Sequence, residues 1–581
     1  MTLPRLHTTV LLLLLLAVSL QPALAQDKTA QIDALLTQYH DYGLFNGTVL
    51  VAEAGDVLFK KGYGDANMEW DIPNQPDTKF RLGSITKQFT AVLILQLMQE
   101  GKLTVDDPIG LHMPDYPNEG ASKVTIHHLL THTSGIPSYT GLPEFFQEMS
   151  RDPATPDEFI DVFSDLPLEF EPGAEWRYNN SGYFLLGVII EKITGMSYED
   201  ALQERIFGPL GMHDTGYDHH GTILPNRAAG YERQGSGYMN APYLDMSLPY
   251  AAGSLYSTVE DLYQWDRALY TDQVLPSDLK EKMFTPYMND YGYGWGINER
   301  SIGETDKKVK TIGHGGGING FNTLITRFPD DEHLVVLLNN TGGTQLGAMS
   351  QGIANILYGE PADPPRQPIS QVMRKAIEEM GVDAAIEHYR HLKESEPDAY
   401  NFAENQLNNL GYEYLRGGDT ETAIAVFKLN VEAYPKAFNP YDSLGEAYMM
   451  AGDNEKAIAN YKKSIELNAG NQNGKDMLKK LGVEMDEEAL TLTAEILDRY
   501  VGVYELQPNL KITITREGTQ LFGQGTGQPQ AELFPQSETR FYLKVAPIQL
   551  EFNVNDGGVA ESLTLYQGGQ EMNAPRVEEG S

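Results

Sequence analysis

The fold is organised around Phe80-Arg81-Leu82-Gly83-Ser84-Ile85-Thr86-Lys87-Gln88-Phe89-Thr90, which runs directly into the apolar segment Ala91-Val92-Leu93-Ile94-Leu95-Gln96-Leu97-Met98. After Gly83 the run contains no proline or glycine until Gly101, which predicts a buried helix of about four turns ending in a glycine cap. Ser84 then lies in the first turn of this helix.

Ser84 and Lys87 form a possible pair of nucleophile and base. Residues three apart share a helix face, so the Lys87 amine can reach the Ser84 hydroxyl. A serine needs a partner to take its proton, and a lysine in a dry pocket loses enough basicity to be neutral. The helix N-terminus also favours negative charge that develops beside Ser84. The spacing leaves a second interpretation open, in which Ser84 only caps the helix and Lys87 lies in solvent.

A second S-x-x-K sequence, Ser277-Asp278-Leu279-Lys280, shows how little the spacing means without its setting. It lacks the long apolar run, so we interpret it as a solvated turn without chemistry. The first copy differs because a catalytic residue needs rigid support and a desolvated environment.

The composition excludes several classes of function. Acidic residues outnumber basic ones by 81 to 43, which gives a formal net charge of -38 over 581 residues. Such a chain repels nucleic acid and anionic lipid, so no polyanionic partner is expected. There is no cysteine, which excludes a thiol nucleophile, a cysteine-based metal site and a disulfide framework.

The N-terminus is typical of a secretory signal. Arg5 supplies the positive end, Val10 to Leu20 the apolar core, and Ala23-Leu24-Ala25 a cleavage site. We therefore expect a periplasmic or secreted bacterial protein. The alternative is an uncleaved N-terminal anchor, although the apolar run is short for a membrane span.

Changes of pattern along the chain predict its domains. Four prolines within residues 360–368 break any helix or central strand and indicate a linker. Beyond it, eight positions recur 34 residues later, for example Leu410 as Leu444, and the tail shows short alternating runs between glycine-rich turns. The predicted domains are a signal peptide (1–25), a domain that contains the Ser84 helix (26–360), the linker (361–368), helical repeats (369–487) and a β-rich domain (488–581).

The order of five motifs carries a resemblance. They are Ser84-x-x-Lys87, His132-Thr133-Ser134-Gly135, Tyr178-x-Asn180, Tyr291-Gly292-Tyr293-Gly294-Trp295-Gly296 and His314-Gly315-Gly316, and they follow one another as in penicillin-recognising serine hydrolases. Each motif is weak alone, but together they resemble the class C β-lactamase branch, with its D-aminopeptidases and esterases.

The resemblance implies an α/β (α+β) fold, the β-lactamase/transpeptidase-like sandwich of an antiparallel sheet and helices. The 34-residue repeats resemble tetratricopeptide repeats, and the tail resembles a small antiparallel, lipocalin-like β-barrel. The repeats are compatible with a helical spacer and with a groove for a peptide or protein partner.

The resemblance also implies roles for individual residues. Ser84 attacks an acyl carbonyl, while Lys87 and Tyr178 share the proton transfers; which of the two is the base stays open. Asn180 holds Lys87 and the substrate amide. The N–H groups of Ser84 and Gly317 form the oxyanion hole.

His314 and Gly316 complete the substrate-binding edge, where glycines let a substrate lie close to the strand. Many relatives have a lysine in place of His314, and a histidine is mostly neutral at pH 7. Carboxylate-bearing substrates such as β-lactams should therefore be held less firmly. His128 and His132 have the spacing of a metal pair but no acidic third ligand, so no metal or other cofactor is expected.

The predicted function is thus an exported serine hydrolase that acts on esters or amides through an acyl-enzyme, as an esterase or D-stereospecific peptidase. One alternative is a β-lactamase or penicillin-binding DD-carboxypeptidase. The other is a catalytically silent peptide-binding scaffold. No G-x-S-x-G sequence occurs, so the nucleophile elbow of α/β-hydrolases is missing.

Overall fold

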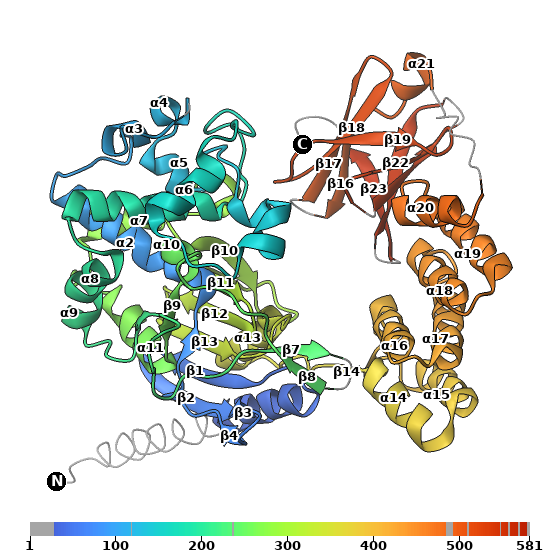
Figure 1. The fold of residues 1–581 in the computed structure, drawn as a ribbon, viewed down its shortest axis with the longest axis horizontal. Coiled ribbons are helices and arrows are strands. Elements are labelled where there is room, and N and C mark those ends of the chain that lie inside the picture. Colours follow the sequence, from blue (N-terminus) through green and yellow to red (C-terminus); the bar gives the residue numbers. More distant parts are fainter. Residues whose placement is uncertain are drawn as a thin grey trace, which may run out of the picture. The chain divides into compact units, whose positions relative to one another are not determined.

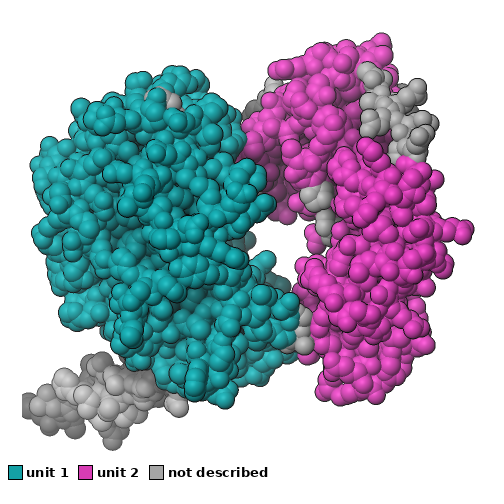
Figure 2. Space-filling view, in the orientation of Figure 1, with its two compact units in different colours: residues 1–365 teal, residues 366–581 magenta. Residues whose placement is uncertain are grey.

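The computed structural model describes residues 28–117, 119–234, 237–483, 492–507, 510–546, 548–555, 558–567 and 570–577. The chain divides into two compact units, residues 1–365 and 366–581 (Figure 2). The predicted signal peptide lies outside the described residues. Within the part of the chain that is described, no helix has the length and apolar character needed to cross a bilayer.

A six-stranded antiparallel sheet forms the centre of the first unit, in the order β10-β11-β12-β13-β1-β2 (Figure 1). Both ends of the unit's sequence contribute to it, because β1 near the N-terminus pairs with β13. Its strands are β1 (Gly47–Glu53), β2 (Asp56–Tyr63), β10 (Gly296–Ser301), β11 (Lys308–Ile318), β12 (Phe321–Phe328) and β13 (His333–Asn339).

The sheet is covered on both faces, as alternating residues of β1 show. Leu50 packs into the larger core with the central helices, whereas Val49 and Val51 pack into a second core with helix α13 (Leu346–Leu357). Successive side chains of a strand point to opposite faces. A strand that is apolar at every position therefore indicates two covered faces, and β1 and β13 are buried along almost their whole length.

Helix α2 (Thr86–Gln99) lies in the middle of the larger core, against α7 (Asn180–Thr194) and α10 (Tyr250–Gly253). Its residues are buried on all sides, as expected for a helix that is apolar around its circumference. Gly187 lets α7 approach α10, because a Cβ there would come within 2.5 Å of the Ala251 methyl group. This packing fixes the start of α2, which follows directly on the turn that contains Ser84.

Shorter elements complete the first unit. The helices are α3 (Ile109–His112), α4 (Gly120–Lys123), α5 (Ile126–Leu130), α6 (Pro156–Ser164), α8 (Tyr198–Leu202), α9 (Gly208–Leu210), α11 (Val259–Ala268) and α12 (Ser277–Met283). The strands are β3 (Asp65–Asn67), β4 (Ile72–Pro73), β5 (Phe80–Arg81), β6 (Gly216–Tyr217), β7 (Tyr231–Gln234), β8 (Gly237–Asn240) and β9 (Leu255–Ser257). The second S-x-x-K sequence begins helix α12, so its interpretation as a turn was wrong.

The second unit begins with antiparallel helix pairs. They are α14 (Ile369–Met380) with α15 (Val382–Ser395), α16 (Glu404–Arg416) with α17 (Thr420–Ala433), and α18 (Phe438–Met450) with α19 (Asn454–Leu467), followed by α20 (Gln472–Lys480). The repeat has a packing cause. A Cβ on Gly411 would lie 2.5 Å from the Phe427 ring, and one on the equivalent Gly445 would lie 3.1 Å from the Tyr461 ring. Small residues thus let each pair of helices close.

The chain ends in a closed eight-stranded barrel, in agreement with the predicted β-rich domain. Its strands are β16 (Gly502–Gln507), β17 (Leu510–Glu517), β18 (Gln520–Gly525), β19 (Ala531–Pro535), β20 (Arg540–Tyr542), β21 (Ile548–Val554), β22 (Ala560–Gln567) and β23 (Gln570–Val577), after helix α21 (Ala494–Leu497). Tyr500 and Phe552 stack in its core, and Phe541 packs against both rings in an edge-to-face arrangement. The sequence had indicated only five of these strands.

Candidate active site

Ser84 lies in a 3-10 turn, Gly83–Ile85, that leads into α2. The expected helix is present, but its first turn is tighter than an α-helical one. Lys87 is the second residue of α2, three positions after Ser84, so the two side chains share a face across the junction. The Lys87 amine lies 3.1 Å from the Ser84 hydroxyl oxygen. Gly83 makes the entry possible, because its φ of +55° is in the left-handed region.

Lys87 is fully buried and has only neutral contacts among those described. Besides Ser84, its Nζ atom contacts Asn180 Oδ1 at 2.8 Å and the Ala252 carbonyl at 2.9 Å. Burial lowers the pKa of Lys87 well below its ordinary value. A neutral amine has two N–H groups and one lone pair. When the two carbonyl oxygens accept the N–H groups, the lone pair is left for the Ser84 proton.

Asn180 is the first residue of α7, so the Tyr-x-Asn motif is also a helix start. Asn179 caps the helix by accepting a bond from the Gly182 N–H. The Asn180 amide then spans two partners. Its Oδ1 accepts from Lys87, and its Nδ2 donates to Thr140 Oγ1 at 2.9 Å. This second bond fixes which end of the amide faces the lysine.

Tyr178 packs its ring beneath the lysine, with Lys87 Nζ 4.9 Å from the ring centroid. Burial raises the pKa of the Tyr178 phenol above its ordinary value, and the nearby Ser84 hydroxyl opposes only part of the rise. The phenol oxygen is buried and forms no hydrogen bond within the described part of the chain. Tyr178 is therefore protonated at neutral pH and suited to donate a proton, while Lys87 is suited to accept one.

His132 is a residue to which the sequence assigned no role. Its ring is buried against Tyr178, with centroids 4.3 Å apart, and its Nδ1 accepts from the Asn179 N–H at 3.1 Å. Its φ of +60° is unusual for a residue other than glycine. His132 thus links the strand-like segment before α7 to the Tyr178 ring. The sequence feature that points to His132 is the His-Thr-Ser-Gly motif, which contains a glycine and lies between the other motifs in the chain. His128 is engaged separately, through the Thr125 N–H.

Strand β11 lies directly against the Ser84 turn. A Cβ on Gly316 would overlap the Leu82 carbonyl oxygen, and one on Gly83 would lie 3.0 Å from the Gly317 nitrogen. Both positions therefore require glycine for the close approach. The approach brings together the two segments whose N–H groups, of Ser84 and Gly317, were expected to form the oxyanion hole.

His314 is held in a neutral form by its two contacts. Its Nδ1 donates to the Gly315 carbonyl at 2.6 Å, so its Nε2 accepts from the Tyr291 hydroxyl at 2.8 Å. Burial and the neighbouring Lys87 lower the pKa of His314 to about 4, although the bond to Gly315 opposes the change. The residue brings no positive charge to the site at pH 7, which agrees with the expectation from the sequence.

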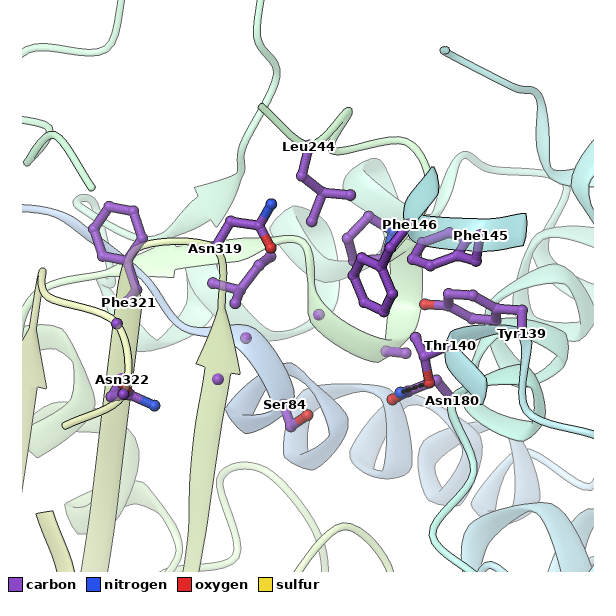
Figure 3. Close-up of a pocket in the computed structure, with 18 of the residues that line it drawn as sticks. Ser84, Tyr139, Thr140, Phe145, Phe146, Asn180, Leu244, Asn319, Phe321 and Asn322 are labelled. Carbon is purple, nitrogen blue, oxygen red and sulfur yellow. Dashed lines mark hydrogen bonds between the residues drawn. The ribbon is translucent and has the colours of Figure 1, made fainter. Parts of the chain in front are cut away.

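A cavity of about 350 Å³ opens above these residues (Figure 3). Ser84, Asn180 and Gly317 line it, whereas Lys87 and Tyr178 lie behind Ser84, and His314 and Gly316 do not reach it. In Figure 3 the aromatic side chains Tyr139, Phe145 and Phe146 lie on one side of Ser84, and Asn319, Phe321 and Asn322 lie on the other. The nucleophile thus lies between an aromatic end and a more polar end.

Comparison with known families agrees with this geometry. Residues 32–357 match the family described as Beta-lactamase. The chain belongs to this family. It is therefore a serine hydrolase of the β-lactamase family, with tetratricopeptide repeats in its second unit, where residues 439–471 match that repeat. Residues 486–576, which include the barrel, match a domain of unknown function.

Three relatives show how far the similarity extends. The chain is 28% identical to Penicillin-binding protein 4* of Bacillus subtilis (strain 168) over 580 residues, 95% of this chain and 99% of the relative. It is 31% identical to the putative penicillin-binding protein PbpX of the same strain over 338 residues, 58% of this chain and 81% of the relative. The octameric penicillin-binding protein homologue from Pyrococcus abyssi shares the fold, with a TM-score of 0.50 and 21% identity over 94% of this chain and 99% of that one.

Proposed function

We propose that this family member is an exported serine hydrolase that cleaves esters or amides through an acyl-enzyme on Ser84, as an esterase or D-stereospecific peptidase. One observation carries the proposal: a fully buried lysine amine lies 3.1 Å from a serine hydroxyl that lines a cavity. Burial without a described carboxylate contact favours the neutral form of Lys87 over its ammonium form. A neutral amine beside the Ser84 hydroxyl can act as a base.

The proposed reaction uses the residues in sequence. Lys87 takes the Ser84 proton as the hydroxyl oxygen attacks the acyl carbonyl, and the N–H groups of Ser84 and Gly317 stabilise the resulting oxyanion. Tyr178 donates its proton to the leaving group as the acyl–oxygen or acyl–nitrogen bond breaks, and the Lys87 ammonium returns a proton to Tyr178. Water then attacks the acyl-enzyme by the same steps in reverse order, which releases the acid and restores Ser84.

Covalent labelling tests the proposal and separates it from a silent scaffold. A fluorophosphonate probe should label Ser84, as located by mass spectrometry, and Ser84→Ala should abolish the label. Ser277→Ala is a matched control, because its S-x-x-K lysine is bound instead to the Thr271 carbonyl and Asp272. Absence of a label on Ser84 in the intact chain would refute the proposal and favour the scaffold.

The neutral His314 supports esters and aminoacyl amides as substrates over carboxylate-bearing ones. No fixed cation stands at the position where many relatives have lysine, so a β-lactam or peptide carboxylate gains no ion pair there. A panel of aryl esters, D- and L-aminoacyl amides, muropeptides and β-lactams tests this choice. Faster turnover of a cephalosporin or a muropeptide than of every ester and aminoacyl amide would favour the β-lactamase or DD-carboxypeptidase alternative.

Export and partner binding are further parts of the proposal. We infer that residues 1–25 are a signal peptide that directs the protein to the periplasm or the medium, and N-terminal sequencing of the mature protein tests this. The repeats between residues 369 and 487 are proposed to hold a peptide or protein partner. The presence of paired helices at a fixed 34-residue period supports that role, because stacked repeats form extended binding surfaces.

A further inference from the structure

Among the described residues that line the cavity, only one side chain is charged, and it is a carboxylate. Glu232, on β7, contributes to the wall, and no lysine or arginine does so. The remaining described lining residues are polar, apolar or glycine. A substrate in this cavity therefore meets a single formal charge, of negative sign.

The carboxylate is held in place by backbone from two neighbouring segments. The Gly320 N–H, in the turn between β11 and β12, donates to Glu232 Oε1 at 2.9 Å. Gly342, in the loop after β13, leaves the space that the carboxylate occupies, since a Cβ there would overlap both of its oxygens. The side chain is thus seated in a fixed position.

Within the described part of the chain, the carboxylate of Glu232 accepts from the Gly320 N–H and forms no ion pair with a lysine, arginine or histidine. Its neighbour Arg233 packs against Gly43. A partly buried carboxylate without a counter-charge gains from a ligand that supplies one. One of its oxygens already has the Gly320 N–H, and the other is left to receive a donor.

A second acceptor lies at the same end of the cavity. Asn319 donates through Nδ2 to the Pro242 carbonyl at 2.9 Å, which orients its amide. Figure 3 shows the amide oxygen on the side of Ser84 and the amide nitrogen on the opposite side. An ammonium group has three N–H donors and no acceptor, so a carboxylate together with a carbonyl oxygen suits it.

We propose that Glu232, with Asn319, binds an ammonium group of the substrate while the scissile carbonyl lies at Ser84. The inference rests on the proposed hydrolase function and specifies its substrate class: esters or amides that carry a protonated amine. The aromatic end at Tyr139, Phe145 and Phe146 then receives an apolar group of the same substrate. The net charge of -38 acts in the same direction, since it concentrates cations and repels carboxylates.

Paired substrates that differ only in one charge test the proposal. We would compare each enantiomer of phenylalanine p-nitroanilide, which has a charged α-amine, with its uncharged N-acetyl derivative. A further substrate, Nα-acetyl-lysine p-nitroanilide, carries its amine on the side chain and so distinguishes a side-chain amine from an α-amine. The ratio of kcat/KM for the amine to that for the uncharged substrate should exceed one. In Glu232→Gln this ratio should fall by about tenfold or more, mainly through KM, because a hydrogen bond between charged groups becomes one between a charged and a neutral group.

One control variant and two possible outcomes decide the test. Glu299→Gln removes the same charge from an exposed position on β10 outside the cavity, and should leave the ratio unchanged. An equal loss for charged and uncharged substrates in Glu232→Gln would overturn the proposal, because it would show a structural role alone. An unchanged ratio would overturn it as well.

A binding measurement keeps the inference distinct from the hydrolase proposal. In Ser84→Ala, calorimetry should show that phenylalanine amide binds at least about tenfold more tightly than its N-acetyl derivative, with the difference lost when Glu232→Gln is added. If the fluorophosphonate fails to label Ser84 but this difference is observed, the hydrolase proposal fails and the ammonium site stands. If labelling succeeds and the two ligands bind alike, the ammonium site fails alone.

Discussion

Replacing Asn180 by aspartate puts a negative charge where the structure has a neutral amide of the same shape. The Oδ1 atom lies 2.8 Å from Lys87 Nζ, and Asn180 also lines the cavity beside Ser84. At an effective dielectric constant of 20, two unit charges at that separation attract by about 6 kcal/mol. Burying the new carboxylate offsets part of this energy, and an adjacent opposite charge typically changes a pKa by about 1 to 3 pH units.

The sign of the effect follows from the role of the amine. Lys87 must be neutral to take the Ser84 proton, and a neighbouring carboxylate stabilises its ammonium form and so raises the pKa of Lys87. Activity that is lost as the pH falls through the pKa of Lys87 is then lost at a higher pH. We expect the acidic limb of kcat/KM to move upward by about 1 to 3 pH units, with activity recovered under alkaline conditions.

The assay is the pH dependence of aryl ester hydrolysis, checked against the rate of fluorophosphonate labelling. Asn298→Asp is the matched control, because Asn298 is exposed on β10 and does not line the cavity. It should leave the limb where it is in the wild-type enzyme. An Asn180→Asp enzyme whose limb stays at the wild-type pH would show that Lys87 is not the proton acceptor.

Three further substitutions test other parts of the site. Tyr178→Phe removes the proposed proton donor, so the rate of amide hydrolysis should fall by about a hundredfold or more. The rate of aryl ester hydrolysis should fall less, because an aryl oxide leaves more readily without a proton. Equal losses for amides and esters would count against this role. Gly316→Ala should reduce the rate of fluorophosphonate labelling at least about a hundredfold, because the new methyl group pushes β11 away from Leu82. Gly347→Ala is the control: the space around Gly347 is open, so this change should leave the thermal unfolding temperature unchanged or raise it. His314→Lys should raise the affinity for a carboxylate-bearing β-lactam relative to an uncharged ester by about tenfold, as read from KM; no change in this ratio would contradict the argument from charge.

The sequence predicted the elements whose pattern is continuous. Helix α2 is an unbroken apolar run between two glycines, and β1 and β13 are apolar at nearly every position. Strand β12 is hard to recognise in the sequence because it contains Arg327, a charged residue that is buried in the structure. Its guanidinium pairs with the buried Asp266 at 2.6 Å, a partner from a distant helix that no local pattern indicates. Strands β18 and β19 are hard to recognise for a local reason, because glycines in β18 and a terminal proline in β19 obscure the alternation of apolar and polar residues.

The candidate site divides in a similar way. Ser84, Lys87, Tyr178, Asn180 and Gly317 could be named from the sequence because motif order survives in the chain, and the structure brings them together. Glu232 could not. Its meaning depends on Gly320 and Gly342, which lie about 90 and 110 positions away, and on the absence of any cation nearby in the described structure.

The position of the one carboxylate at the cavity follows from the needs of the lysine. Lys87 works only if it is neutral, and its Asn180 and Ala252 partners are neutral oxygens that do not hold it in the charged form. A carboxylate beside Lys87 would stabilise its ammonium form and so lower the activity at neutral pH. At the far end of the wall, Glu232 attracts a cationic substrate, and the ammonium that it binds cancels its charge. The Asn180→Asp and Glu232→Gln variants should therefore separate the two effects: the first changes the pH at which every substrate reacts, and the second changes which substrate reacts at a given pH.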